Sequence, residues 1–83
     1  MNKVLVCVYV PLIEQEFDLF IPINRKIGLI KKIIVNAIIE LTNSSYRING
    51  PIKLSNKKTN HVYSDDEFIV NTDIRNGTKL VLL

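Results

Sequence analysis

The stretch RKIGLIKKIIVNAIIEL, residues 25–41, has the apolar spacing of an amphipathic helix. Apolar side chains recur every three or four residues along it and form one stripe, made of Ile27, Ile30, Ile33, Ile34, Ala37, Ile38 and Leu41. Isoleucine ordinarily favours a strand, but the length and the period of this stretch indicate a helix. Asn24 stands where it can cap the first turn. A single helix of this kind needs one sheet to cover its apolar face.

Two segments before the helix have the alternating pattern of strands. KVLVCVYVP (residues 3–11) alternates valines with other side chains, and EFDLFIP (residues 16–22) continues with the same period. Pro11 ends the first segment, because proline has no N–H to give to a strand ladder. The short connection between the segments predicts a hairpin.

The chain after the helix is predicted to hold shorter strands separated by turns. TNSSYRINGP (residues 42–51) has the composition of a loop, and IKLS (52–55) and HVY (61–63) flank a hairpin connection. NGTKLVLL (residues 76–83) begins with a turn signal and continues as a last strand. The predicted order is therefore strand, strand, helix, strand, short strand, strand.

This order predicts an α+β fold with a mixed sheet of four to five strands and one helix packed across one face. The first and last strands are expected to lie side by side and parallel in the middle of the sheet. Residues 1–83 are expected to form a single domain, because 83 residues are close to the size at which one core only just supports independent folding.

Alternation assigns the apolar side chains of the sheet to two faces. Those expected to face the helix are Val4, Val6, Val8, Phe17, Leu19, Ile21, Leu80 and Leu82. Those expected on the opposite, outer face are Leu5, Cys7, Tyr9, Phe20, Val81 and Leu83. A sheet in a monomer usually turns a polar face to water, so this surplus predicts a protein-binding patch, with Lys53 and Lys79 as its charged rim. The alternative is that the loop over residues 42–51 covers part of this face.

The helix suggests a second contact site. On a helical wheel, Val35 and Ile39 lie almost opposite Ile30 and Leu41 of the apolar stripe. Both side chains are therefore expected to be exposed and available to a partner.

Charge and composition narrow the class of protein. Eleven Lys and Arg against eight Asp and Glu give a net charge of +3, and these cations are scattered without an aromatic stacking motif. This indicates a solvated surface, not a nucleic-acid footprint. The apolar runs fall short of the roughly 20 residues that a membrane helix needs, so no membrane insertion is expected. One cysteine, Cys7, and no signal peptide before the first strand indicate a reducing, cytoplasmic setting.

Catalytic chemistry is not expected. Cys7 and His61 are the single cysteine and the single histidine, and a lone cysteine inside a strand is usually a packing residue. SDDE (residues 64–67) does not have the spacing of a calcium loop and is predicted to be a solvated loop. Three glycines and one histidine supply neither a phosphate-binding loop nor a Ser-His-Asp set. We therefore expect no enzyme, no cofactor and no metal site.

Three segments carry a resemblance to a known family: FDLFIP (residues 17–22), INRKIGLIKKII (23–34) and TDIRNGTKLVLL (72–83). In this order they resemble the β-grasp fold of ubiquitin and, more closely, the small ubiquitin-like proteins of bacterial type VII secretion, the YukD/EsaB family. The resemblance runs across nearly the whole chain and rests on order and spacing. Thr78 follows Gly77 where that family often has an acidic residue.

The resemblance implies a cytoplasmic, non-conjugating accessory or regulatory protein that binds components of a type VII (WXG-type) secretion machine noncovalently. The outer sheet face is also a candidate surface for homo-oligomerisation. Conjugating relatives and sulfur carriers need a flexible tail ending in Gly-Gly, whereas the sequence here ends in its last strand at Leu83. The alternative is a sulfur carrier or protein modifier whose glycine tail is absent from this sequence.

Overall fold

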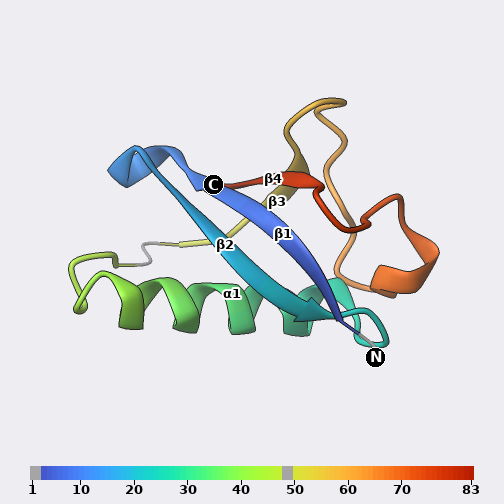
Figure 1. Ribbon diagram of the computed structural model, residues 1–83, viewed down its shortest axis with the longest axis horizontal. Helices are drawn as coiled ribbons and strands as arrows, with labels where there is room; N and C mark the ends of the chain where they lie inside the picture. Colours follow the sequence, from blue (N-terminus) through green and yellow to red (C-terminus); the bar gives the residue numbers. More distant parts are fainter. Residues whose placement is uncertain (1–2, 48–49) are drawn as a thin grey trace.

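The computed structural model describes residues 3–47 and 50–83. Its elements are β1 (Lys3–Val10), η1 (Pro11–Ile13), β2 (Gln15–Pro22), α1 (Ile27–Leu41), β3 (Leu54–Asn56), η2 (Ile69–Asn71) and β4 (Lys79–Leu82), where η marks a 3-10 helix. The strands form a four-stranded sheet in the order β2-β1-β4-β3, and α1 runs along one face of it (Figure 1). The predicted architecture, a mixed sheet with one helix across it, is confirmed.

The first and last strands lie side by side in the centre of the sheet. β1 and β4 are parallel and set Val8 beside Leu80, as predicted. The pairs β1–β2 and β3–β4 are antiparallel. A parallel pair cannot be joined by a tight turn, so the chain crosses between these two strands by way of α1 and β3.

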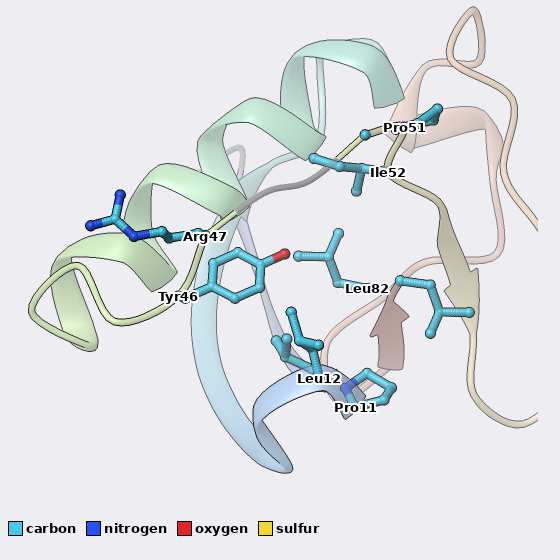
Figure 2. A pocket seen from close by; sticks show the side chains of 10 residues that line it. Pro11, Leu12, Tyr46, Arg47, Pro51, Ile52 and Leu82 are labelled. Atoms are coloured by element: carbon cyan, nitrogen blue, oxygen red, sulfur yellow. The ribbon is translucent and has the colours of Figure 1, made fainter.

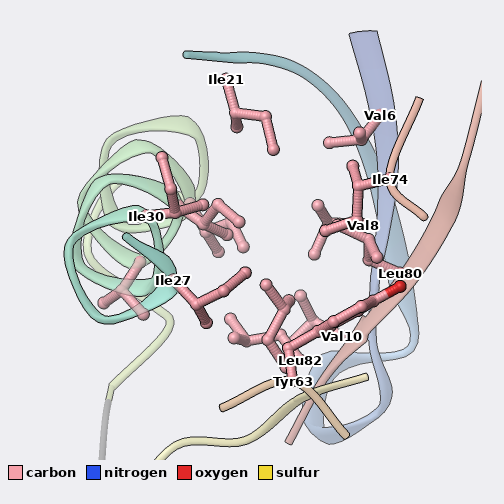
Figure 3. Close-up of a cluster of buried hydrophobic side chains, with 14 of the residues drawn as sticks. Val6, Val8, Val10, Ile21, Ile27, Ile30, Tyr63, Ile74, Leu80 and Leu82 are labelled. Atoms are coloured by element: carbon pink, nitrogen blue, oxygen red, sulfur yellow. The ribbon is translucent and has the colours of Figure 1, made fainter. Parts of the chain in front are cut away.

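The core fills the space between α1 and the inner face of the sheet (Figure 3). Its buried side chains from the sheet include Val6, Val8, Val10, Ile21, Leu54, Leu80 and Leu82. Val4, Phe17 and Leu19 are partly buried and pack against this cluster. The alternation read from β1, β2 and β4 therefore assigns the inner face correctly.

The buried face of α1 differs from the predicted stripe along one margin and at the last residue of the helix. Val35 is only 3% exposed and Ile39 is half-buried against the core, so the predicted exposure of both side chains is wrong. Leu41, in contrast, is 59% exposed. At about 100° per residue, Val35 lies only about 60° from Ile38, which is fully buried near the middle of the stripe. On the same wheel Leu41 lies only about 20° from the fully buried Ile34, so its exposure reflects its place as the last residue of α1 and not its direction.

The start of α1 is held by main-chain groups from a distant loop. Asn24 lies before the helix, and in the part of the chain that the structure describes no side chain caps the first turn. The N–H of Ile27 donates instead to the carbonyl oxygen of Glu67 at 2.8 Å. Lys31 Nζ lies 2.6 Å from Asp65 Oδ1. The SDDE loop, which was predicted to be only solvated, therefore packs against the first turn of α1 and satisfies amides that a helix start leaves without partners.

The predicted short strand over residues 61–63 reduces to an isolated bridge between Ser55 and Val62. The main-chain N–H of Asn56 donates to the carbonyl oxygen of His61 at 2.9 Å, which closes a turn directly after β3. The returning chain therefore meets β3 over only a short length.

Candidate protein-binding face

The residues predicted for the outer face all retain exposed surface on the side of the sheet away from α1. The exposed fractions of Leu5, Phe20 and Leu83 are 37%, 63% and 62%. The half-buried members are Cys7, Tyr9 and Val81, and both rim residues, Lys53 and Lys79, are exposed. The side chains on this face are therefore available for contact.

Strand register separates these side chains into two apolar pairs. Leu5 lies directly opposite Phe20 on β1 and β2, and we call these two residues the Leu5–Phe20 pair. Tyr9 lies opposite Val81 on β1 and β4. Side chains at directly opposite positions are close enough to pack against each other, so each pair is a small apolar cluster.

A charged row lies between the two pairs. Cys7 is opposite Asp18 on one side and opposite Lys79 on the other. The outer face is therefore not the continuous apolar patch that alternation predicts. Alternation shows which side chains share a face, but not which charged residues of the neighbouring strands stand between them.

A lysine that the sequence does not single out partly covers the second pair. Lys57 Nζ lies 5.1 Å from the centre of the Tyr9 ring, within the range of a cation–π contact. The same nitrogen lies 3.7 Å from Glu16 Oε2. Lys57 follows β3 directly and is an even number of residues from Lys53, so the sequence could have placed it on the same face as Lys53. Its position over Tyr9, however, depends on the order of the strands in the sheet. The Leu5–Phe20 pair is consequently the more open of the two apolar clusters.

Charge on the outer face is divided between its two sides. Glu16 and Asp18 are on β2, and we call them the acidic edge. Lys53, Lys57 and Lys79 are on or beside β3 and β4. The carboxylates belong to the β2 side of this face and the lysines to the β3–β4 side, and Lys57 reaches across to Glu16 at 3.7 Å. This division favours a partner whose charges are complementary to it.

Cys7 lies in the middle of this face, where its surroundings raise the pKa of its thiol. Burial, and then the nearby carboxylates of Glu16 and Asp18, raise the pKa of its thiol, while Lys79 acts in the opposite direction. The thiolate is the reactive form, so these surroundings disfavour reaction at neutral pH. The packing role of Cys7 stays a prediction.

A groove of about 460 Å³ opens where β1 and β4 end (Figure 2). Leu12 from the hairpin turn and Leu83 from the chain end line it, and Leu12 is 75% exposed. Tyr46, from the loop after α1, is buried and faces the groove, whereas Arg47 points away from it. The described part of that loop therefore packs at the end of the core, and it leaves Leu5 and Phe20 uncovered.

A polar cluster that the sequence analysis missed joins the buried side chains of Asn56 and Tyr63 to the exposed Asp73 of the later loops. The Tyr63 hydroxyl donates to Asp73 Oδ1 at 2.5 Å and accepts from Asn56 Nδ2 at 3.2 Å. Burial, followed by the hydrogen bond to Asp73, raises the pKa of Tyr63 to about 12. Because the three side chains are hydrogen-bonded to one another, this cluster ties β3 to the later loops.

Over residues 3–47 and 50–83, no helix is both long and apolar enough to cross a membrane. Within the same residues, no three His, Cys, Asp or Glu side chains are grouped so that they could hold a metal ion.

Comparisons with known proteins identify the fold. No family model and no curated protein matches the chain. The ubiquitin-like domain of the type VII secretion system protein EccD1 from Mycobacterium tuberculosis matches 100% of this chain and 99% of its own, with a TM-score of 0.78 and 13% identity. A chain of the MycP5-free ESX-5 inner membrane complex matches at a TM-score of 0.76 and 12% identity. That match covers 100% of this chain but 21% of the other, so the chain spans about a fifth of its length.

A third structure shows that the fold is shared more widely. A chain of the toluene 4-monooxygenase HD complex with the inhibitor 4-bromobenzoate has a TM-score of 0.79 at 6% identity, over 96% of this chain and 95% of the other. Identities this low establish the fold and do not decide the function. The sheet order, the helix across it and these matches together make the chain a ubiquitin-like β-grasp domain, similar in structure to domains of type VII secretion proteins.

Proposed function

We propose that the chain is a non-conjugating ubiquitin-like accessory or regulatory protein of a bacterial type VII secretion system, of the YukD/EsaB kind. The observation that carries this proposal is the match to the EccD1 ubiquitin-like domain, which extends over essentially the full length of both chains. In this proposal the protein works in the cytoplasm, binds components of the secretion machine noncovalently and is not an enzyme.

The outer sheet face is the proposed contact surface, and the Leu5–Phe20 pair is its centre. Phe20 is 63% exposed, and aromatic side chains are frequent energetic anchors in protein interfaces. Lys79 and Asp18 border the pair and would set the orientation of a partner. Because this apolar area is small, we expect modest affinity unless homo-oligomerisation through the same face adds to it.

The test is copurification of the tagged chain with secretion components encoded beside its gene. Phe20→Lys should reduce recovery of these components about ten-fold or more, because it places a charge in the centre of the apolar pair. Val70→Lys is the matched control, since Val70 is 51% exposed but lies in η2, outside the outer face. Thermal melts of both variants must first show that each one is folded.

Three results would contradict the proposal. The first is that no secretion component is encoded nearby or recovered with the chain. The second is equal recovery with Phe20→Lys and with the unchanged chain, which would remove the outer face from the contact. The third is recovery of the protein covalently joined to targets through its C-terminal carboxylate, which would establish the modifier alternative.

A further inference from the structure

The two edges of the sheet differ in how their outward main-chain groups are satisfied. At the β3 edge, Leu54 accepts a hydrogen bond from the N–H of Tyr63 at 3.0 Å, and Asn56 donates to the carbonyl oxygen of His61 at 2.9 Å. Returning chain thus covers β3. β2 (Gln15–Pro22) is the other edge, and among residues 3–47 and 50–83 no strand lies beyond it in the sheet.

Hydrogen bonds on β1 determine which groups of β2 face this open edge. The N–H of Cys7 donates to the carbonyl oxygen of Thr78 at 3.1 Å, so Cys7 directs its main-chain groups toward β4. Neighbouring residues in a strand alternate in direction, so Val6 directs its groups toward β2. Its partner Leu19 is therefore a residue whose N–H and C=O face β1.

The even-numbered residues of β2 consequently direct their N–H and C=O groups outward. These are Glu16, Asp18 and Phe20, followed by Pro22, which has a carbonyl group but no N–H. Within residues 3–47 and 50–83, none of the main-chain groups of Glu16, Asp18 and Phe20 bonds to another part of the chain. An edge of this kind can accept an added strand.

The side chains at these bonding positions all lie on the outer face and have a definite chemical order. Glu16 and Asp18 are acidic, and Phe20 is apolar and exposed. Asp18 forms no ion pair with any residue in the described part of the chain. Lys3 lies opposite Pro22 and ends the acidic run. A strand added here would place its own outer-face side chains directly opposite these groups.

We propose that β2 is a strand-addition site for an extended, basic segment of a partner protein. The segment supplies an apolar side chain opposite Phe20 and basic side chains opposite Asp18 and Glu16. In the sequence of the segment, these three residues are separated from one another by single residues. Main-chain hydrogen bonds provide affinity, and the two charge pairs provide register. The proposal does not depend on the role in secretion, because it rests on the hydrogen-bond direction and the charge of β2 alone.

A second copy of the chain fits this edge less well than a basic segment does. The symmetric antiparallel register that uses Glu16, Asp18 and Phe20 of both copies places Asp18 opposite Asp18 of the second copy. Like charges at directly opposite positions are destabilising. Sliding to a register that faces Phe20 with Phe20 brings in Pro22, whose missing N–H shortens the ladder.

The experiment uses the isotope-labelled chain and a short synthetic peptide with capped ends and the order Val-Thr-Lys-Thr-Lys, together with its reverse. Amide hydrogen exchange is measured residue by residue. At saturating peptide, the amides of Glu16, Asp18 and Phe20 should exchange at least about ten-fold more slowly. The amides of Phe17 and Leu19 already face β1 and should change little.

Matched peptides separate main-chain pairing from simple charge attraction. In Val-Thr-Lys-Thr-Lys, which pairs antiparallel to β2, N-methylation at the valine and lysine positions removes the donors that face β2 and should abolish binding, whereas N-methylation at the threonines should be tolerated. In the reversed peptide, which pairs parallel to β2, the threonines supply these donors and the two outcomes should be exchanged. Replacing both lysines by glutamate should weaken binding about ten-fold or more, and Asp18→Asn about two- to five-fold. Asp66→Asn, an exposed carboxylate in the SDDE loop, should leave binding unchanged.

The proposal is overturned if the lysine peptides give no slowing at Glu16, Asp18 and Phe20, or if the glutamate peptide binds equally well. It is also overturned if sedimentation shows a dimer of the peptide-free chain with the same three amides protected, because a second copy would then occupy the edge. The assay contains no secretion component, so its outcome is separate from that of the copurification.

Discussion

Leu83 and Lys53 exchange two main-chain hydrogen bonds, each 2.9 Å from nitrogen to oxygen. These bonds continue the β3–β4 ladder one residue past the bounds of both strands. Leu82 points into the core at 1% exposure, while the side chain of Leu83 is 62% exposed. Two adjacent leucines at the end of one strand therefore have different roles, because strand geometry sends neighbouring side chains to opposite faces.

This difference predicts unequal costs of substitution in the last strand. Leu82→Ala should lower the free energy of unfolding by about 2–5 kcal/mol, through lost burial and the cavity left behind. Leu83→Ser should change it by no more than about 0.5 kcal/mol, because it leaves the main-chain bonds in place at an exposed position. Urea melts of the two variants provide the measurement. Equal losses would mean that the faces of β4 are assigned the wrong way round.

Ile39 and Leu41 of α1 are predicted to differ in how much a lysine at each position destabilises the fold. Ile39→Lys should destabilise the fold by about 2 kcal/mol or more, because Ile39 packs against the core. Leu41→Lys should be tolerated, since Leu41 is 59% exposed on the same helix. Circular dichroism melts can compare the two lysine variants directly. If the Ile39→Lys protein were fully stable, Ile39 would be an exposed side chain that is available for contact with a partner.

The buried Tyr63 hydroxyl predicts a loss of stability at high pH. Its pKa is raised to about 12 in the folded chain, against about 10 for an exposed tyrosine. The contribution of the protonated Tyr63 hydroxyl to the free energy of unfolding is therefore fully present below about pH 10. It is lost as the pH rises toward about 12, and the loss is on the order of 2–3 kcal/mol. Tyr63→Phe should lose stability at pH 8 but show a shallower decline above pH 10. Parallel slopes for the two proteins would contradict this assignment.

The surroundings of Cys7 predict slow alkylation with a defined response to charge. The pH profile of iodoacetamide modification should have its midpoint above that of the unfolded chain, because burial and two carboxylates raise the pKa of the thiol. Asp18→Asn should lower the midpoint, and Lys79→Gln should raise it. Cys7→Ser should leave partner binding largely intact. A midpoint near neutral pH, or an adduct at Cys7 that function requires, would show a reactive thiol instead.

Local periodicity was enough to predict much of this fold. The alternation of β1 and β2 separates Val6 and Val8 from Leu5 and Phe20, and the structure places these side chains on the two faces as expected. The same reasoning identified the helix. It also found the outer-face residues, because a side chain's direction depends on its parity within its own strand and not on which strand lies beside it.

Tertiary structure alone decided how these residues are combined. The charged row through Cys7, and Lys57 over Tyr9, depend on strand register and sheet order. The buried Asn56 side chain likewise depends on where the chain returns with Tyr63. A period in the sequence specifies direction within one element, whereas neighbours across elements are set by long-range packing and hydrogen bonds that no local pattern encodes. For the same physical reason, the open, acidic edge of β2 could be recognised only after the partners of β1 and β3 were known.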